Sequence, residues 1–387
     1  MEYRLDELFD LQMGKTPSRN NPEYWNTKDN KWISIADLSK CGKYIDTTKE
    51  CISNKAVSES GIAQIPENTV IMSFKLSIGK TAITTESMYS NEAIISFRDK
   101  HIVEVLPEYL YYLVLSKDWS AGTNKAVMGK TLNKATLSKI KVNIYDISQQ
   151  HEVVDILDKV NNVILSRKQE LQKLDELVKS RFIEMFGIPG KDAFGWGLVP
   201  LGSVCSINPK KSHDQRLVSG AEVSFVPMPA VTERGEIDAT AIKEYDEVKT
   251  GFTYFAENDV LFAKITPCME NGKGAVAKGL HNGIGFGSTE FHVLRPISGK
   301  TDPSWIYALT AFSQFRMDAV SNMTGSAGQR RVPASFLENY RVSLPPIALQ
   351  EQFAAFVEQT DKSKFAVQQA LDKAQLLFDS LMQKYFG

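Results

Sequence analysis

The chain has 387 residues, more than the roughly 100 to 200 residues of one ordinary domain, and therefore predicts at least two packed cores. Its composition, 43% hydrophobic and 24% charged, excludes a collagen-like chain, a disulfide-rich miniprotein and a wholly disordered chain. The formal net charge of −1 argues against a protein that coats nucleic acid indiscriminately, because attraction to phosphates grows with the number of lysines and arginines presented.

The sequence favours a cytoplasmic protein with no membrane partner. Its apolar runs are short and interrupted by charge, and its start lacks the basic, apolar and small-residue segments of a secretory signal. The four cysteines form no CxxC pair and have no histidine at zinc-finger spacing. They are Cys41, Cys51, Cys205 and Cys268. We therefore expect no structural metal.

The two halves of the sequence resemble each other. At a shift of 200 residues, Gln150 aligns with Gln350, Leu171 with Leu371, and Phe186-Gly187 with Phe386-Gly387, without a gap. Upstream matches fall at shifts of 190 and 196, as for Pro107 and Pro303. The changing shift predicts two copies of one scaffold that differ in their loops, each a variable region followed by a uniform one.

Each uniform region reads as a long helix, because apolar residues recur every seven positions. Ser148 is the predicted N-cap of the first helix, and Pro345-Pro346 precedes the second. We expect the two apolar stripes to pair, which makes the helices antiparallel; two helices folded separately onto their own domains are the alternative. The stripes include Leu157, Ile164, Leu171, Val178 and Met185 in the first copy, and Phe353, Val367, Ala374 and Leu381 in the second.

The variable regions alternate short β-type runs with turn residues, and each ends in a helical stretch that starts at a proline. Helix breakers between Gly187 and Pro200 place the start of the second region. We predict an α+β fold of two similar mixed α/β domains and two long antiparallel helices forming a coiled coil, with a pseudo-two-fold internal repeat. The predicted segments are residues 1–147, 148–187, 188–346 and 347–387. The predicted strands are Trp32–Ile35, Val70–Phe74, Ala93–Phe97, Val223–Val226, Val260–Ala263 and Phe291–Leu294, and the predicted short helices are Pro107–Ser116 and Pro303–Phe312.

The sequence shows no complete catalytic constellation. Two runs that end like phosphate-binding loops, Gly79-Lys80-Thr81 and Gly129-Lys130-Thr131, lack the earlier glycine that such a loop requires. The five histidines show no triad spacing. A free-standing nuclease that uses Asp259, Glu270 and Lys273 remains one alternative, and a coiled-coil scaffold with no role on DNA is another.

Several sequence motifs stand out in the two halves. They are Gly14-Lys15-Thr16-Pro17-Ser18-Arg19, Trp32-Ile33-Ser34, Val226-Pro227-Met228, the run from Asp259 to Gly274, and Leu344-Pro345-Pro346-Ile347-Ala348-Leu349-Gln350. These motifs resemble those of the DNA specificity subunit of type I restriction-modification systems. Together with the repeat and the helices, the resemblance covers essentially the whole chain. The first half departs from the pattern, because it carries only Leu76-Ser77-Ile78-Gly79-Lys80 where the second has its Thr-Pro-Cys-Met-Glu-Asn-Gly-Lys run.

The resemblance implies a non-catalytic subunit that recognises double-stranded DNA. Each variable region would be a target recognition domain for one half of a bipartite sequence, and the helices would be conserved spacers that set the distance between the halves. Two modification (methyltransferase) subunits, which bind the cofactor S-adenosylmethionine, would dock on this frame. Restriction subunits, which supply the motor and nuclease, would join for cleavage. The chain itself would hold no cofactor.

Basic and polar residues in the motifs and in two acid-free stretches are the predicted DNA contacts. Lysines and arginines would bind phosphates, while amides, hydroxyls and arginine forks would read base edges. A solvated basic loop face is the alternative for each stretch. The predicted contacts are Lys15, Thr16, Arg19, Lys75, Lys80, Lys125 and Lys130 in the first region, and Lys264, Thr266, Lys273, Gln329, Arg330 and Arg331 in the second.

Overall fold

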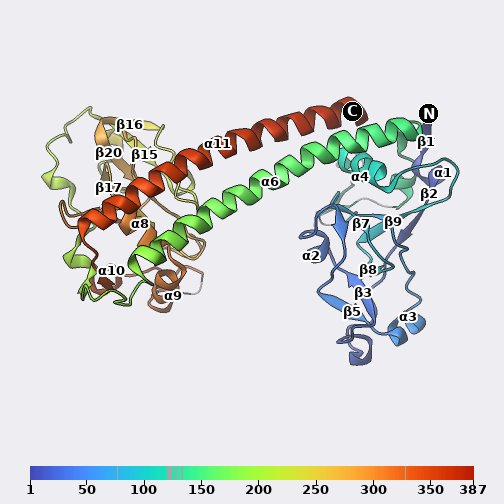
Figure 1. Cartoon of the computed structure of the whole chain (residues 1–387), viewed down its shortest axis with the longest axis horizontal. Coiled ribbons are helices and arrows are strands. Elements are labelled where there is room, and N and C mark those ends of the chain that lie inside the picture. Colours follow the sequence, from blue (N-terminus) through green and yellow to red (C-terminus); the bar gives the residue numbers. More distant parts are fainter. Residues whose placement is uncertain (76, 120–123, 127–128, 132–133, 327) are drawn as a thin grey trace. The chain divides into compact units, whose positions relative to one another are not determined.

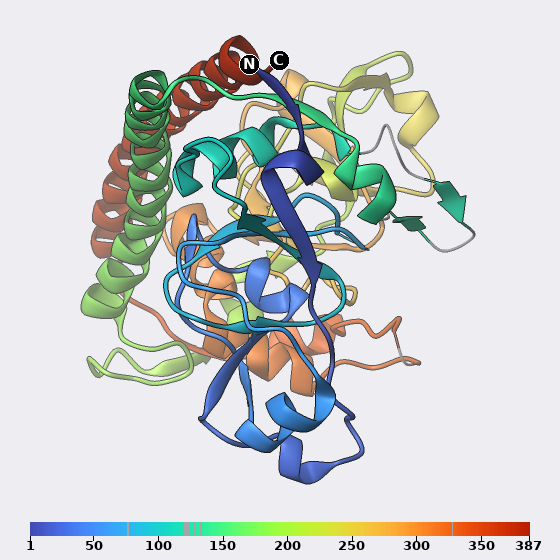
Figure 2. The same ribbon diagram turned by 90° about the vertical axis from the view of Figure 1, so that its right-hand side faces the viewer.

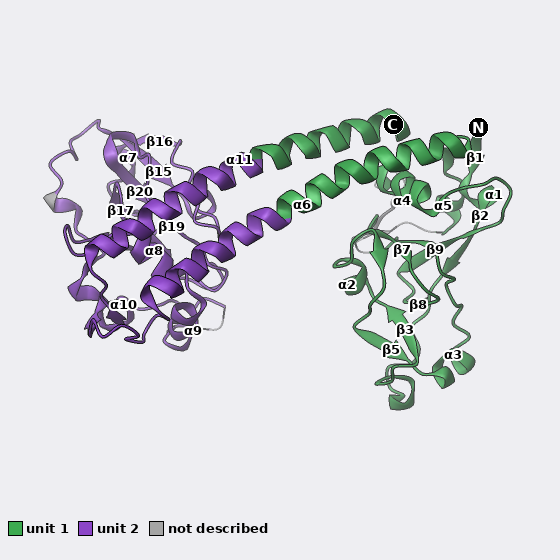
Figure 3. Ribbon diagram, viewed as in Figure 1, with its two compact units in different colours: residues 1–168, 369–387 green, residues 169–368 purple. Residues whose placement is uncertain are grey.

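The computed structural model describes residues 1–387 except 76, 120–123, 127–128, 132–133 and 327, and it leaves the side chains of residues 121–133 and His213 undescribed. The chain forms two compact units (Figures 1 and 3). Unit 1 comprises residues 1–168 and 369–387, and unit 2 comprises residues 169–368. Among the described residues, no helix is both long and apolar enough to cross a membrane.

Unit 1 contains two main sheets, and helix α4 (Pro107–Ser116) packs on β6 and β7 of the larger one. The larger sheet has the order β2 (Phe9–Met13), β9 (Ile94–Asp99), β6 (Val70–Ser73), β7 (Thr81–Thr84), β4 (Tyr44–Ile45). The smaller has the order β5 (Glu50–Ile52), β3 (Asn30–Ile33), β8 (Tyr89–Ser90). The remaining elements are β1 (Glu2–Arg4) paired with β12 (Lys141–Asn143), the hairpin β10 (Asn124–Ala126) and β11 (Gly129–Thr131), α1 (Leu5–Leu8), η1 (Pro22–Tyr24), α2 (Ile35–Leu38), α3 (Asn54–Ser60) and α5 (Lys134–Ser138).

Unit 2 repeats this plan, with helix α8 (Pro303–Ala311) against β18 and β19. Its first sheet has the order β14 (Cys205–Ile207), β21 (Phe291–Pro296), β18 (Val260–Ala263), β19 (Gly274–Val276). Its second has the order β16 (Ile242–Glu244), β15 (Glu222–Val226), β20 (Ile284–Gly287), β17 (Thr253–Ala256). The remaining elements are β13 (Leu198–Pro200) paired with β22 (Arg341–Ser343), η3 (Leu201–Ser203), η4 (Lys211–His213), η5 (Met228–Ala230), α7 (Tyr245–Val248), η6 (His281–Gly283), α9 (Ser313–Ser321) and α10 (Ala334–Asn339).

Helices α6 (Ile147–Phe186) and α11 (Ile347–Phe386) have 40 residues each and lie side by side (Figures 1 and 2). In unit 1, the start of α6 and the end of α11 share one core, in which Leu157 is buried and Phe386 lies 5.3 Å from Tyr109 between ring centroids. In unit 2, the end of α6 meets the start of α11, with Phe182 and Phe353 5.6 Å apart. The helices therefore run antiparallel, which confirms the predicted arrangement.

Two buried glutamines, Gln150 and Gln350, make equivalent hydrogen bonds in the two units. The side chain of Gln150 accepts a hydrogen bond from the backbone N–H of Leu106 and donates to the carbonyls of Glu104 and Tyr145. Gln350 makes the same pattern in unit 2, because it accepts from Asp302 and donates to Lys300 and Pro345. Both side chains are fully buried. Each glutamine thus ties the first turn of a long helix to the loop before α4 or α8.

Two local predictions were wrong. The cap of α6 is Asp146, not Ser148: the helix begins at Ile147, and the Asp146 carboxylate accepts from the backbone N–H of Gln149 at 2.9 Å. The strand predicted to reach Ile35 ends at Ile33, because Ser34 forms a capping box with Asp37 and starts α2. In both places a short polar side chain that satisfies free N–H groups decides the boundary.

We predict that Gln150→Ala and Gln350→Ala each lower the free energy of unfolding by roughly 3 kcal/mol, because each leaves several buried backbone groups without a partner. Urea unfolding followed by circular dichroism measures the change. The exposed neighbours serve as controls, and Gln149→Ala and Gln352→Ala should each change stability by less than about 0.5 kcal/mol. Equal effects at the buried and exposed positions would contradict the role given to the glutamine pair.

Candidate nucleic-acid interface

In unit 2, the structure brings most of the predicted contacts together on one surface, although they come from two separate segments. The loop after β18 docks against residues 330–332: Thr266 N–H donates to the Arg330 carbonyl at 3.0 Å, and Val332 N–H donates to the Lys264 carbonyl at 2.9 Å. Arg331 also forms antiparallel bridges with Thr324 and Ile265. Lys264, Thr266, Gln329, Arg330 and Arg331 therefore share one rigid backbone frame, which we call the unit 2 basic frame.

The two arginines of this frame are paired with different carboxylates. Arg331 donates from Nη2 and Nε to Glu290, at 2.7 and 3.0 Å, whereas Arg330 makes one longer contact from Nη2 to Glu270, at 3.2 Å. The Arg331 guanidinium lowers the pKa of the Glu290 carboxyl. Both members of that pair are therefore charged at neutral pH. Arg330 and Arg331 are adjacent in the sequence but therefore have different electrostatic surroundings.

Lys273 lies at the far end of the same loop, where its Nζ is 3.4 Å from the Met228 carbonyl. The preceding Gly272 has φ +96°, and an added Cβ would lie 1.9 Å from Nη1 of Arg316. Arg316 Nη2 donates to the Gly272 carbonyl at 2.8 Å, so α9 supports the loop from behind. Arg316 was not predicted from the sequence, because no local sequence pattern indicates that an arginine in a helix binds the carbonyl of a distant glycine.

Unit 1 places Lys80 at the position equivalent to Lys273. The Lys80 carbonyl accepts from Ser73 N–H at 2.8 Å, as the Lys273 carbonyl accepts from Ala263 N–H at 3.2 Å. The Lys80 ammonium donates to the Ser39 hydroxyl at 2.6 Å, and Lys75 Nζ lies 5.3 Å from the centroid of the Phe74 ring. The glycine–lysine end of this loop is therefore common to both units.

The segment that follows β2 carries the other unit 1 predictions. Gly14 is required there, because a Cβ would lie 2.3 Å from the carbonyls of Ser90 and Asn91. Lys15 Nζ donates to the Ser60 carbonyl at 2.5 Å, and the Thr16 hydroxyl donates to the Glu92 carboxylate. This hydrogen bond lowers the pKa of Glu92.

Arg19 is held on three sides. Its Nη1 and Nη2 donate to the two carboxylate oxygens of Glu50 at 2.6 and 2.9 Å. Its guanidinium carbon lies 3.7 Å from the centroid of Trp25 and 5.0 Å from that of Trp32. Both terminal nitrogens therefore already bind a partner, and the two indole rings fix the plane of the group.

Lys125 and Lys130 are Cα partners across the β10–β11 hairpin, and their side chains lie outside the described residues. The hairpin has a counterpart in unit 2. Asn124 pairs with Thr131, as Thr324 pairs with Arg331 200 residues later. An antiparallel pairing at the same repeat position thus carries basic residues in each unit.

His292 lies buried beneath the unit 2 basic frame. Its Nε2 is 2.8 Å from the Val332 carbonyl and therefore carries the proton, while Nδ1 is 3.0 Å from the Asn208 amide nitrogen and accepts from it. Burial lowers the pKa of His292. A second proton, on Nδ1, would face the Asn208 amide group that now donates to this nitrogen.

The nuclease alternative fails on geometry. Asp259 is 1% exposed, and its two oxygens accept from Nε and Nη2 of Arg295, each at 2.7 Å. Glu270 is already bound to Thr266 and Arg330. Among the described residues, no group of three or more histidines, cysteines or acids could hold a metal ion.

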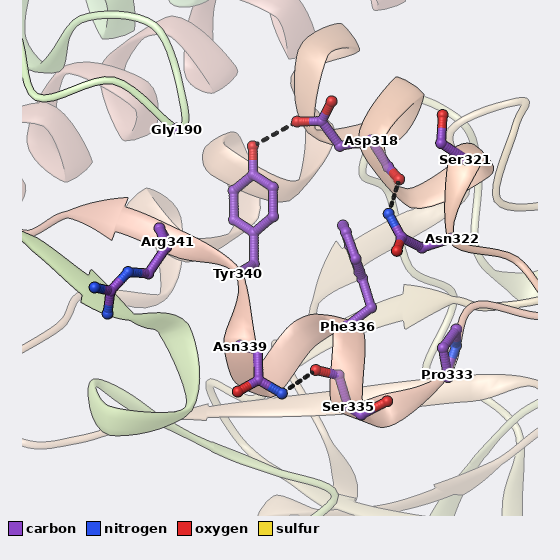
Figure 4. A pocket seen from close by; sticks show the side chains of 10 residues that line it. All are labelled: Gly190, Asp318, Ser321, Asn322, Pro333, Ser335, Phe336, Asn339, Tyr340 and Arg341. Carbon is purple, nitrogen blue, oxygen red and sulfur yellow. Dashed lines mark hydrogen bonds between the residues drawn. The ribbon is translucent and has the colours of Figure 1, made fainter.

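An open hollow of about 600 Å³ lies between α9, α10 and β22 (Figure 4). Asp318 and Arg341 are the charged side chains in its described lining. The Asp318 carboxylate accepts from the Tyr340 hydroxyl at 3.0 Å and from Gln314 at 2.9 Å. Its acid is therefore engaged in holding helices together, and the described lining offers no paired nucleophile and base.

We predict that Asp259→Asn lowers the free energy of unfolding of unit 2 by about 3 kcal/mol, because it leaves Arg295 facing a buried neutral amide. Glu270→Gln, at a partly exposed ion pair, should cost less than about 1 kcal/mol. Urea unfolding of the full chain compares the two. Equal stability of both variants and the parent would show that Asp259 has no structural role.

A second prediction concerns pH. Because the pKa of His292 is lower in the folded chain, the unfolded chain binds the proton more readily, and stability falls as pH drops below the ordinary histidine pKa of about 6.5. This group alone contributes a slope of at most about 1.4 kcal/mol per pH unit. His292→Gln should flatten the slope measured by urea unfolding between neutral and mildly acidic pH. The exposed-site control His151→Gln should keep the parental slope, and an unchanged slope in His292→Gln would refute the assignment.

Comparison with known proteins places this geometry in a family. The family model described as the type I restriction modification DNA specificity domain matches residues 1–176 and 194–375. The chain is similar to the type I restriction enzyme EcoEI specificity subunit of Escherichia coli, at 45% identity over 156 residues, or 39% of this chain and 25% of that one. It is also similar to the EcoAI specificity subunit of Escherichia coli, at 35% identity over 233 residues, or 57% and 38%.

The chain thus spans 25% and 38% of the lengths of these two relatives. Among solved structures, it resembles the type I restriction-modification system S subunit from M. genitalium, with a TM-score of 0.55, 12% identity and coverage of 100% and 96% of the two chains. That likeness concerns the fold. The family match, which covers most of the sequence in two segments, shows that this chain belongs to the family of the type I restriction modification DNA specificity domain.

Proposed function

We propose that this chain is the DNA-sequence-reading specificity subunit of a type I restriction-modification complex. Residues 1–147 and 188–346 act as target recognition domains, each for one half of a bipartite target in double-stranded DNA. The observation that carries the proposal is the repeat itself: each unit presents a glycine–lysine loop end and, at equivalent positions, an antiparallel pairing that carries basic residues. Membership of the family agrees with this reading.

The helices, residues 148–187 and 347–387, act as spacers and as the docking frame for two modification subunits. A frame with pseudo-two-fold symmetry offers the same surface twice to two identical partners. Large apolar side chains remain exposed on both helices, including Leu165 and Leu177 on α6 and Phe365 and Leu376 on α11. Restriction subunits join the complex for cleavage, and the whole assembly acts in the cytoplasm.

The chemistry belongs to the partners in this proposal. The modification subunits bind S-adenosylmethionine and methylate adenine, while this chain selects where they act. Its contacts with DNA divide into phosphate-binding lysines, which set the register, and polar or arginine side chains, which read bases. The proposed contacts are Lys15, Thr16, Arg19, Lys75, Lys80, Lys125, Lys130, Lys264, Thr266, Lys273, Gln329, Arg330 and Arg331.

Adenine methylation mapped across a genome tests the proposal directly. Cells that express this chain with its modification subunits should show one bipartite methylated motif, and cells that lack only this chain should lose it. A contiguous motif, or one that persists without the chain, would refute the proposal. Retention of methylation without this chain would favour the scaffold alternative.

The spacer role makes a separate prediction. Inserting seven residues after Lys168 and seven after Gln368 keeps both apolar stripes in phase, because the stripes repeat every seven residues. Each helix lengthens by about 10 Å, at 1.5 Å per residue. We expect the unread gap of the motif to grow by about three base pairs, at 3.4 Å each, with both half-sites unchanged. Methylation mapping measures the gap, and changed half-sites with a constant gap would contradict the spacer role.

A further inference from the structure

The Arg331–Glu290 pair differs in geometry from the other arginine pairs of the candidate interface. A guanidinium carries five N–H donors in one plane. In Arg331, Nε and one N–H of Nη2 face Glu290, and one N–H of Nη1 donates to the Gln329 carbonyl at 3.1 Å. Two donors are left, one on each terminal nitrogen, in a side chain that is 42% exposed. The Arg331 guanidinium is thus held in one orientation, while two of its five N–H donors are left for a ligand.

The backbone on both sides of this pair is fixed. Arg331 N–H donates to the Thr324 carbonyl at 2.8 Å, and the Arg331 carbonyl accepts from Thr324 at 3.0 Å. Glu290 is anchored as well, because its carbonyl accepts from Lys264 N–H at 2.9 Å and its own N–H donates to the Ser288 hydroxyl at 3.2 Å. Donor direction is therefore set before any ligand arrives, which lowers the entropy cost of using it.

Charge decides which ligand suits such a group. A phosphate is recognised mainly through its charge, and a carboxylate at 2.7 Å cancels most of the field that Arg331 could offer it. The two unused N–H donors of Arg331 keep their direction. Hydrogen bonds to the edge of a base depend more on the direction of the donors than on net charge. In the major groove, guanine presents two neighbouring acceptors, O6 and N7, that suit a pair of arginine donors.

Resting on the proposed function, we infer that Arg331 reads a guanine in the half-site of the second recognition domain, and that Glu290 is the positioning residue that orients it. Arg331 recognises the base through its two unused N–H donors. Glu290 acts through Arg331 and does not touch DNA in this assignment.

The chain supplies two comparison residues. Arg330 has the same charge and backbone frame but only one contact, at 3.2 Å to Glu270, so it suits a phosphate. Arg19 binds Glu50 through one N–H of each terminal nitrogen, so it also keeps unused terminal donors, but it belongs to unit 1, where its guanidinium carbon lies 3.7 Å from the centroid of Trp25. Of the two arginines in the unit 2 basic frame, Arg331 is therefore the one that combines a bidentate carboxylate partner with unused terminal donors.

The test maps adenine methylation by the assembled complex of this chain and its modification subunits. Arg331→Lys keeps the charge and removes the fork, so it should relax one guanine position of the second half-site and leave every other position intact. The preference for guanine there should fall roughly 5- to 150-fold, the discrimination of one bidentate contact. Glu290→Gln should relax the same position, because the neutral amide no longer orients the fork.

The matched control is Arg330→Lys, which should keep the motif unchanged, while Arg330→Ala should weaken methylation equally at all sites. Thermal unfolding of each chain verifies that it is folded, and the lysine and glutamine variants preserve side-chain size. An unchanged motif in Arg331→Lys, a uniform loss at all sites, or relaxation at a base pair without a specified guanine would overturn the inference. If the parent complex yields no bipartite motif, the proposed function fails instead, and the two failures are thus distinct.

Discussion

The antiparallel pairing of α6 and α11 is the constraint on which the rest of the structure depends. Neither 40-residue helix can bury its apolar stripe alone, and in each unit the stripe of one helix is completed by the other. Phe386 thereby enters the core of unit 1, and Phe353 enters that of unit 2. Each recognition domain is consequently closed by a helix from the opposite half of the sequence, so the repeat cannot be divided into two independently complete copies.

The buried glutamines link this helical frame to the recognition domains. Gln150 and Gln350 each satisfy three backbone groups around the helix start, in a place where water is excluded. A hydrogen bond made there is costly to lose, because the abandoned groups have no alternative partner. The same polar side chain in both copies therefore ties the start of a long helix to the loop before α4 or α8.

Sequence reasoning recovered the features that depend on periodicity and missed those that depend on distant contacts. The seven-residue stripes predicted both helices and their pairing, and the shift of 200 residues predicted the common plan. Helix α4 has the predicted bounds Pro107–Ser116, since its proline marks the start. No local pattern could reveal that Arg316 supports Gly272, that Glu290 binds Arg331, or that Asp259 is neutralised by Arg295. Each of these pairs joins residues at least 36 positions apart.

The carboxylates beside the predicted arginines explain how a chain with a net charge of −1 can suit a sequence-reading role. Genomic DNA offers a vast excess of wrong sites, so the ratio of specific to non-specific affinity matters more than affinity alone. Glu50 and Glu290 neutralise Arg19 and Arg331, which would otherwise attract any phosphate. Such pairing weakens sequence-independent binding and keeps hydrogen-bond direction at Arg331. In the proposed complex, discrimination would then come from the geometry of a few fixed donors, and partner subunits would supply the affinity that the chain gives up.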